Sequence, residues 1–199
     1  SKDYRSWNAE PILTISEKVE KYTPVIGDFV IKSYDDSEIN EGPYINEIIK
    51  VYHDVMKRNF EIKNEIYEKI CVYMNSDTWW KDGVAHKKVR IQFPFCRTKK
   101  DIINSVFNKQ IAIELNKSFK LKNLTELIDD GWEHAVKDIG EYVVLYGSTE
   151  EPKSIPPLRF ISVFGSEGEN GLCAVLKLND VFSYKKHSLF QERSINSED

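Results

Sequence analysis

The densest group of cationic side chains lies near the middle of the chain and comprises Lys87, Lys88, Arg90, Arg97, Lys99 and Lys100. Such a group suits a surface that follows a phosphate backbone, although a solvated strand face has the same composition. Trp79 and Trp80 precede Lys81, and indole rings beside a cation can stack on nucleobases. The alternative for this pair is one buried and one half-exposed tryptophan. The sequence therefore leaves nucleic-acid binding and an ordinary protein surface both open here.

Several kinds of catalytic centre have no motif in this sequence. The chain has no G-x-x-x-x-G-K-[ST], no G-x-G-x-x-G and no G-x-S-x-G, which excludes a P-loop enzyme, a Rossmann oxidoreductase and an α/β-hydrolase within this segment. Its cysteines, Cys71, Cys96 and Cys173, are three in number and widely spaced, so neither a zinc knuckle nor a disulfide framework is expected.

The elements that must position any site follow from periodicity. Alternating or β-branched segments predict strands at 24–32, 69–74, 87–95, 142–146 and 158–164, which we expect in one sheet, with a return strand at 172–178. Helical spacing of apolar residues predicts one helix from Ile45 to Phe60 and another that opens at a Thr98–Asp101 capping box and runs to about Asn116. Shorter helices are expected at 15–22 and 123–131. Pro94 predicts an edge or a bulge at the end of its strand.

Composition limits the class of protein. The 199 residues are 41% hydrophobic and carry a net charge of −4, and their apolar runs are only a few residues long. A single intracellular α/β domain without a membrane segment is expected from these values. The negative balance excludes a uniformly basic nucleic-acid binder but allows a local basic patch.

An ordered series of segments carries the most information about family. It runs through Gly27-Asp28-Phe29-Val30, the helix from Ile45, Val89-Arg90, Gly131-Trp132, Asp138-Ile139-Gly140, Tyr146-Gly147-Ser148 and Pro157-Leu158. In order and spacing the series, over residues 22–166, resembles the primase domain of the primase–helicase proteins of large double-stranded DNA viruses, the poxvirus-type family within the archaeo-eukaryotic primase superfamily.

The resemblance implies a fold and a division of the chain. The fold would be α/β (α+β), with an RRM-like mixed sheet and helices packed against it. Residues 1–22 would form an N-terminal extension, residues 23–180 the primase-like domain, and residues 181–199 a polar, mobile tail.

The resemblance also implies two-metal phosphoryl transfer, in which paired carboxylates on one strand hold two divalent ions. A D-x-D pair suits this role because residues i and i+2 of a strand point to the same face. In the family, a histidine on a neighbouring strand contacts the nucleotide phosphates and a third aspartate lies further along the chain. Basic residues follow a Gly-Ser turn and face the nucleotide.

This chain departs from that pattern at several positions. Asp28 matches the first carboxylate, but Val30 occupies the second position and Arg90 the histidine position. Asp138 matches the third carboxylate. Ser148 is followed by acidic rather than basic residues. We therefore expect Asp28 and Asp138 to bind Mg²⁺ or Mn²⁺ weakly, while Arg90 contacts a phosphate or occupies the metal region.

The function expected from the resemblance is a primase-like domain in viral DNA replication, with a degraded catalytic site. Its partners would be single-stranded DNA, nucleotides and a helicase part of the same or a partner chain, in the host cytoplasm or nucleus. If active, it would be a template-directed nucleotidyltransferase that uses Mg²⁺ or Mn²⁺, with Asp35 or Asp36 as a possible substitute ligand. The alternatives are a non-catalytic nucleic-acid- or protein-binding module and a purely structural Asp28.

Overall fold

The fold is taken from a computed structural model that describes residues 16–33, 42–62, 65–121, 131–145, 148, 155–167 and 173–176. Its strands are β1 (Ser16–Lys18), β2 (Tyr22–Ser33), β3 (Ile70–Asn75), β4 (Trp79–Lys81), β5 (Val84–Lys99), β6 (Val136–Lys137), β7 (Tyr142–Val144), β8 (Leu158–Glu167) and β9 (Cys173–Leu176). Its helices are α1 (Gly42–Asn59), the 3₁₀ turn η1 (Glu65–Glu68), α2 (Lys100–Ile102), the π-helical turn η2 (Ile103–Phe107), α3 (Asn108–Leu121) and α4 (Trp132–Ala135).

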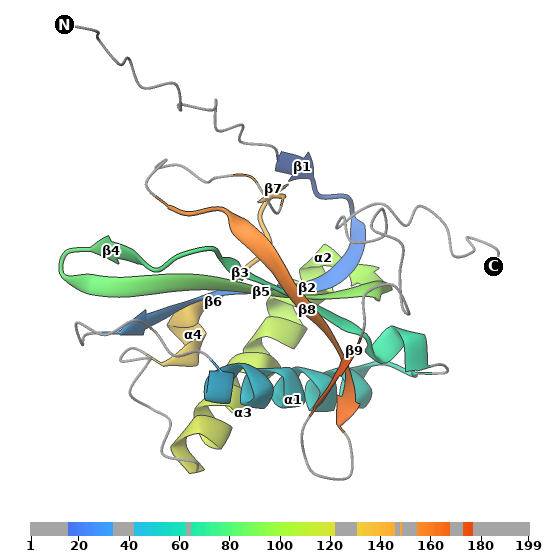
Figure 1. Cartoon of the computed structure of the whole chain (residues 1–199). Coiled ribbons are helices and arrows are strands. Elements are labelled where there is room, and N and C mark those ends of the chain that lie inside the picture. The colour runs from blue at the N-terminus through green and yellow to red at the C-terminus, as the bar shows by residue number, and fades with distance from the viewer. Residues whose placement is uncertain are drawn as a thin grey trace, which may run out of the picture.

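A seven-stranded sheet forms the centre of the molecule. Its order is β6-β2-β5-β3-β8-β9, and β4 pairs with β5 in addition (Figure 1). The expected α/β (α+β) class is confirmed, and where a mixed sheet was expected, each described strand pairing is antiparallel. The β4–β5 hairpin turns at Asp82-Gly83, both with positive φ, as a two-residue hairpin turn requires.

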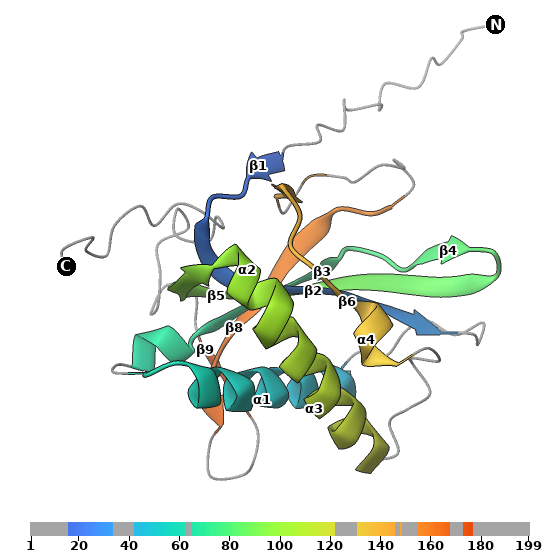
Figure 2. The same ribbon diagram turned by 180° about the vertical axis from the view of Figure 1, so that it is seen from behind.

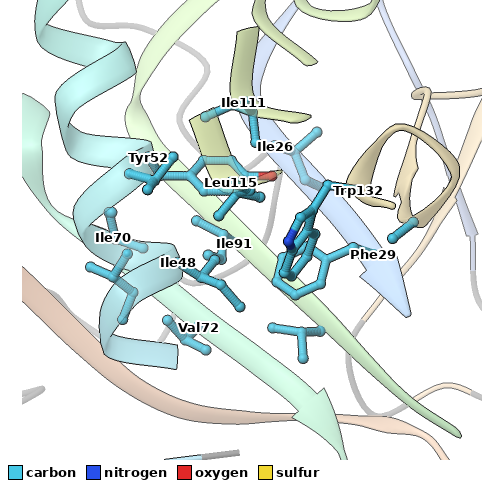
Figure 3. Close-up of a cluster of buried hydrophobic side chains, with 14 of the residues drawn as sticks. Ile26, Phe29, Ile48, Tyr52, Ile70, Val72, Ile91, Ile111, Leu115 and Trp132 are labelled. Atoms are coloured by element: carbon cyan, nitrogen blue, oxygen red, sulfur yellow. The ribbon is translucent and has the colours of Figure 1, made fainter. Parts of the chain in front are cut away.

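The helices cover one face of this sheet, as Figure 2 shows from behind. The apolar face of α1 was predicted from its periodicity, and its members Ile48, Ile49, Tyr52, Val55 and Met56 are fully buried. They pack against the odd-numbered residues of β2 and β5, including Val25, Phe29, Val89 and Ile91. Figure 3 shows this cluster, with Phe29 against Trp132 in an edge-to-face contact at 5.5 Å.

The opposite face of the sheet carries the even-numbered residues of β2 and β5. A small second core of Cys71, Tyr73, Phe95, Leu158 and Val163 covers one part of it. A second part of this face is covered by the two-stranded sheet of β1 and β7, which lies on the side of the main sheet away from the helices (Figure 1). This arrangement leaves a partly covered polar region over β2 and β5, away from the main core.

Three local predictions are wrong. Residues 142–146 were expected in the main sheet, but β7 pairs with β1, residue Tyr142 facing Lys18. Because of this pairing, residues 16–18 of the segment expected as a helix over 15–22 form strand β1 instead. Thr98 does not cap a helix, because β5 continues to Lys99 and pairs with β2 up to Tyr22.

Other local predictions are confirmed. The register between β2 and β5 shifts from Pro24 opposite Arg97 to Val25 opposite Phe93, so Pro94 lies in a bulge. The second helix runs as α2, η2 and α3 to Leu121, beyond the predicted end, and β9 returns antiparallel to β8. The helix expected at 123–131 lies almost wholly outside the described residues. Within the described residues, no helix is long and apolar enough to cross a membrane.

Candidate nucleotide-phosphate site

The site is organised around one carboxylate, Asp28, in the middle of β2. Gly27 before it faces the helices, and a Cβ at that position would lie 2.6 Å from Cζ of the buried Tyr52 ring. The strand can therefore rest on α1 only because residue 27 has no side chain, and Asp28 then faces the opposite side of the sheet. Burial raises the pKa of Tyr52, and the negative charge of Asp28 raises it further, so the phenol stays neutral.

Arg90 on β5 lies directly opposite Asp28 in the strand register. Its Nε donates to Asp28 Oδ1 at 2.6 Å and its Nη2 donates to Asp28 Oδ2 at 2.7 Å, which is the two-pronged geometry of the strongest carboxylate pairs. Its Nη1 donates to the carbonyl of Val144 in β7 at 2.5 Å. One guanidinium therefore joins the main sheet to the two-stranded sheet above it.

Lys88 completes the charge environment of Asp28. Its Nζ lies 3.4 Å from Asp28 Oδ2, and its side chain is only 15% exposed. Burial by itself would raise the pKa of the Asp28 carboxyl, but Arg90 and then Lys88 outweigh it and hold that pKa below its ordinary value. Asp28 is therefore ionised at neutral pH and both of its oxygens are engaged by cations.

A cavity of about 340 Å³ opens beside this ion pair. Among its lining residues are three cations, Lys88, Arg90 and Lys137, and two carboxylates, Asp28 and Asp138. Lys137 lies on β6 directly opposite Asp28 and is exposed. With three positive and two negative groups, the cavity favours an anionic ligand.

Asp138 lines the same cavity and is exposed. Its Oδ1 accepts a hydrogen bond of 3.3 Å from Asn108 Nδ2. Among the described residues, no three His, Cys, Asp or Glu side chains are grouped so as to hold a metal ion. Asp35 and Asp36, the substitute ligands considered above, lie outside the described residues.

The structure separates the cationic residues that the sequence had grouped. Lys88 and Arg90 share the face of Asp28, whereas Lys87 is opposite Ile31 on the helix side. Beyond the bulge, Arg97 donates to the carbonyl of Tyr22 at 2.9 Å. The cavity is not lined by Arg97, Lys99 or Lys100. Ser148 does not line it either; this residue is buried, and its N–H donates to the carbonyl of Leu145.

The two tryptophans of β4 lie apart from the cavity. Trp79 stacks on His86 with ring centroids 4.2 Å apart, and Trp80 is 50% exposed. Val30, at the second carboxylate position, is half-buried opposite Lys88.

Sequence reasoning did not select Lys137. The available signal was its position next to Asp138. Sequence reasoning also did not select the asparagines of η2 and α3, which hold the segment that carries Asp138. For example, Asn104 Oδ1 accepts from Ile139 N at 2.9 Å, and its Nδ2 donates to Ile139 O at 3.0 Å.

The chain has counterparts among known proteins. The family described as "C962R protein N-terminal AEP domain" matches residues 4–163. The chain is also 24% identical over 200 residues to "Putative helicase 121R" of Invertebrate iridescent virus 3. The aligned region covers 94% of this chain and 20% of that protein. The chain thus spans about a fifth of the length of this relative. From the family match, which covers most of its residues, the chain belongs to the C962R-type N-terminal AEP domains of the archaeo-eukaryotic primases.

Proposed function

We propose that this primase-family domain serves a viral DNA replication protein by binding the phosphates of nucleotides or single-stranded DNA, without two-metal catalysis at Asp28. The observation that supports the proposal most is the double hydrogen bond from Arg90 to Asp28. It occupies both oxygens of the carboxylate that the family would use for a metal ion. Phosphoryl transfer by two metals depends on charge neutralisation, so a missing second carboxylate at Val30 would remove much of it.

The charges of the cavity support the binding half of the proposal. Lys88 and Lys137 flank the Arg90–Asp28 pair, and a phosphate group that enters would meet these two ammonium groups and the guanidinium edge. Arginine and lysine contacts to phosphate need correctly placed cations but no metal ion. We propose that a helicase part, in the same chain or a partner, acts on the bound strand, and that this takes place in the infected cell.

The test combines two assays on the same preparation. Primer synthesis is measured on a single-stranded DNA template with Mn²⁺, and binding of a labelled strand is measured by fluorescence anisotropy at two salt concentrations. We expect no primer product and an affinity that falls steeply with salt, as phosphate contacts require. Lys88→Glu should weaken binding about tenfold or more, as the loss of a cation and gain of a repulsive charge at a phosphate would.

A matched control separates the cavity from general charge. Lys87→Glu makes the same charge change on the neighbouring residue, which faces the other side of β5, and it should weaken binding much less. Efficient primer synthesis that is lost in Asp28→Ala would overturn the non-catalytic half of the proposal. Equal loss of affinity in the two lysine variants, or no binding at low salt, would overturn the phosphate-binding half.

A further inference from the structure

The β4–β5 hairpin extends the main sheet well beyond the cavity of the proposed phosphate site (Figure 1). Side chains alternate along a strand, so His86 and Arg90 of β5 lie on the same face, about 13 Å apart along the strand. On β4, Trp79 is paired with His86 and shares that face, whereas Trp80 is paired with Ala85 and lies on the other face. The indole of Trp79 is therefore on the cavity side of the sheet.

Trp79 and His86 form a stacked pair of rings on this hairpin. Their centroids are 4.2 Å apart, and their planes differ by 16°. His86 is 9% exposed, whereas Trp79 is half-buried, so the accessible part of the pair belongs to the indole. His86 Nδ1 donates to the carbonyl of Val84 at 2.9 Å, which holds the ring on which the indole rests. The hairpin thus presents an aromatic surface in a fixed orientation.

Cationic side chains lie on the same face as this ring pair. Lys32 on β2 is directly opposite His86, and Lys81 on β4 is two residues beyond Trp79. The pKa of His86 is lowered chiefly by burial, and the positive charges of Lys32 and Lys81 lower it further, so the imidazole is neutral at pH 7. Lys88 lies between the hairpin and the cavity. A row of cations therefore leads from the cavity to the two rings.

This combination is typical of surfaces that bind single-stranded nucleic acid. Lysine and arginine contact the phosphates, and the bases stack on aromatic side chains whatever their sequence. A duplex fits less well, because its bases are already stacked on one another and present no open ring face. A partner protein also fits less well, since lysine is depleted at protein–protein interfaces, whereas here Lys32 and Lys81 lie beside the rings.

We infer that single-stranded DNA held at the phosphate site continues along this face of β5 and stacks a base on Trp79. The inference rests on the proposed function for the phosphate contacts at the cavity. It adds a second contact surface, the hairpin, which selects a single strand over a duplex. Lys32 and Lys81 contact the phosphates next to the stacked base, and Trp80, on the opposite face, takes no part.

The experiment measures by fluorescence anisotropy how tightly the chain binds a labelled oligothymidine and an abasic strand of the same length and charge. For the wild-type chain we expect the oligothymidine to bind about fivefold or more tightly, as one stacked base provides. In Trp79→Leu the ratio of the two dissociation constants should fall below about twofold, whereas Trp79→Phe, which keeps a ring, should retain most of it. Trp80→Leu, the same change on the opposite face of β4, should keep the wild-type ratio.

A second measurement needs no variant. An oligothymidine in which 5-iodouracil replaces thymine should crosslink to Trp79 of the wild-type chain on irradiation, as mass spectrometry of the peptides would show. A wild-type ratio near one, an equal fall in Trp79→Leu and Trp80→Leu, or crosslinks only at other residues would overturn the stacking contact while the phosphate site stands. If neither strand binds, the phosphate site fails as well and the inference fails with it.

Discussion

Arg90→Met is the substitution that tests the centre of the site most directly. It removes the guanidinium but keeps a side chain of similar length and apolar volume on β5. Asp28 would then keep only Lys88 at 3.4 Å, and the carbonyl of Val144 would lose its donor. The structure therefore predicts a carboxylate left in a low-dielectric setting with half of its former partners.

The expected size of the effect follows from burial and geometry. The side chains of Arg90 and Asp28 are 3% and 20% exposed, and their two hydrogen bonds are 2.6 and 2.7 Å long. Breaking a buried pair by removal of one partner typically costs about 3–5 kcal/mol. Because Lys88 still compensates in part, we expect about 3 kcal/mol, which in a chain of this size is roughly 6–12 °C in Tm.

The loss should depend on pH in a defined direction. In the wild type the pKa of Asp28 is lowered, so its stabilising contribution is present above the ordinary pKa of 3.8 and is lost only as pH falls through the lower folded value. In Arg90→Met, burial raises that pKa with only Lys88 to oppose it. Protonation then relieves the variant as pH falls. The difference in unfolding free energy should therefore be largest near pH 7 and should shrink toward pH 4.

The assay is urea unfolding at pH 7, 5.5 and 4. Arg58→Met is the matched control, because Arg58 also forms an ion pair, 3.1 Å from Glu114, with a side chain that is 54% exposed, and exposed pairs contribute about 0–1 kcal/mol. Asp28→Asn/Arg90→Met should recover part of the loss, since both charges are then absent. A loss equal to that of Arg58→Met, or one independent of pH, would refute a buried Asp28–Arg90 pair.

Three further predictions concern the core. Gly27→Ala should destabilise the chain by about 1–3 kcal/mol through overlap with Tyr52, and Tyr52→Phe should recover part of this in urea unfolding of the double variant; additive losses would contradict the contact. Burial lowers the pKa of His53 and of His86, so the free energy of unfolding should be maintained above pH 6.5, the ordinary pKa, and should fall as pH drops below it. His53→Gln should reduce the slope of unfolding free energy against pH between pH 7 and 5 without abolishing it, because His86 remains. Burial raises the pKa of the Cys71 thiol to about 12, so mass spectrometry should find it unmodified by iodoacetamide at pH 8 until urea is added.

Much of the fold could be predicted because its long elements are strongly periodic. The apolar stripe of α1 is borne out by burial, and the shared face of Val89, Ile91 and Phe93 on β5 by their place in the main core. β7 was assigned to the wrong sheet because a three-residue apolar strand carries no information about its partner. Thr98 looked like a helix cap, but pairing of β5 with β2 holds it in extended conformation, and such tertiary contacts override local signals.

The candidate site was predictable to a smaller extent. The family resemblance singled out residues 28, 90 and 138, and the structure brings Asp28, Arg90 and Asp138 to one cavity. The family resemblance could not supply Lys137, which is brought to the cavity by the pairing of β6 with β2. Nor could periodicity identify Asn108, because polar residues at helical spacing are also typical of a solvated helix face. Only the packing of β6 against α3 shows that this side chain is buried.

The register of β2 against β5 explains why the two departures from the family pattern belong together. Residue 28 faces residue 90, and residue 30 faces residue 88. At position 90 a neutral histidine would leave the Asp28 oxygens open to a divalent cation, whereas arginine donates to both of them. At position 30 a second carboxylate would offset Lys88, whereas valine adds no negative charge beside that ammonium. Both differences shift the charge of one small region in the same direction. Under the proposed function they are a single change in ligand preference, from metal ions to phosphate.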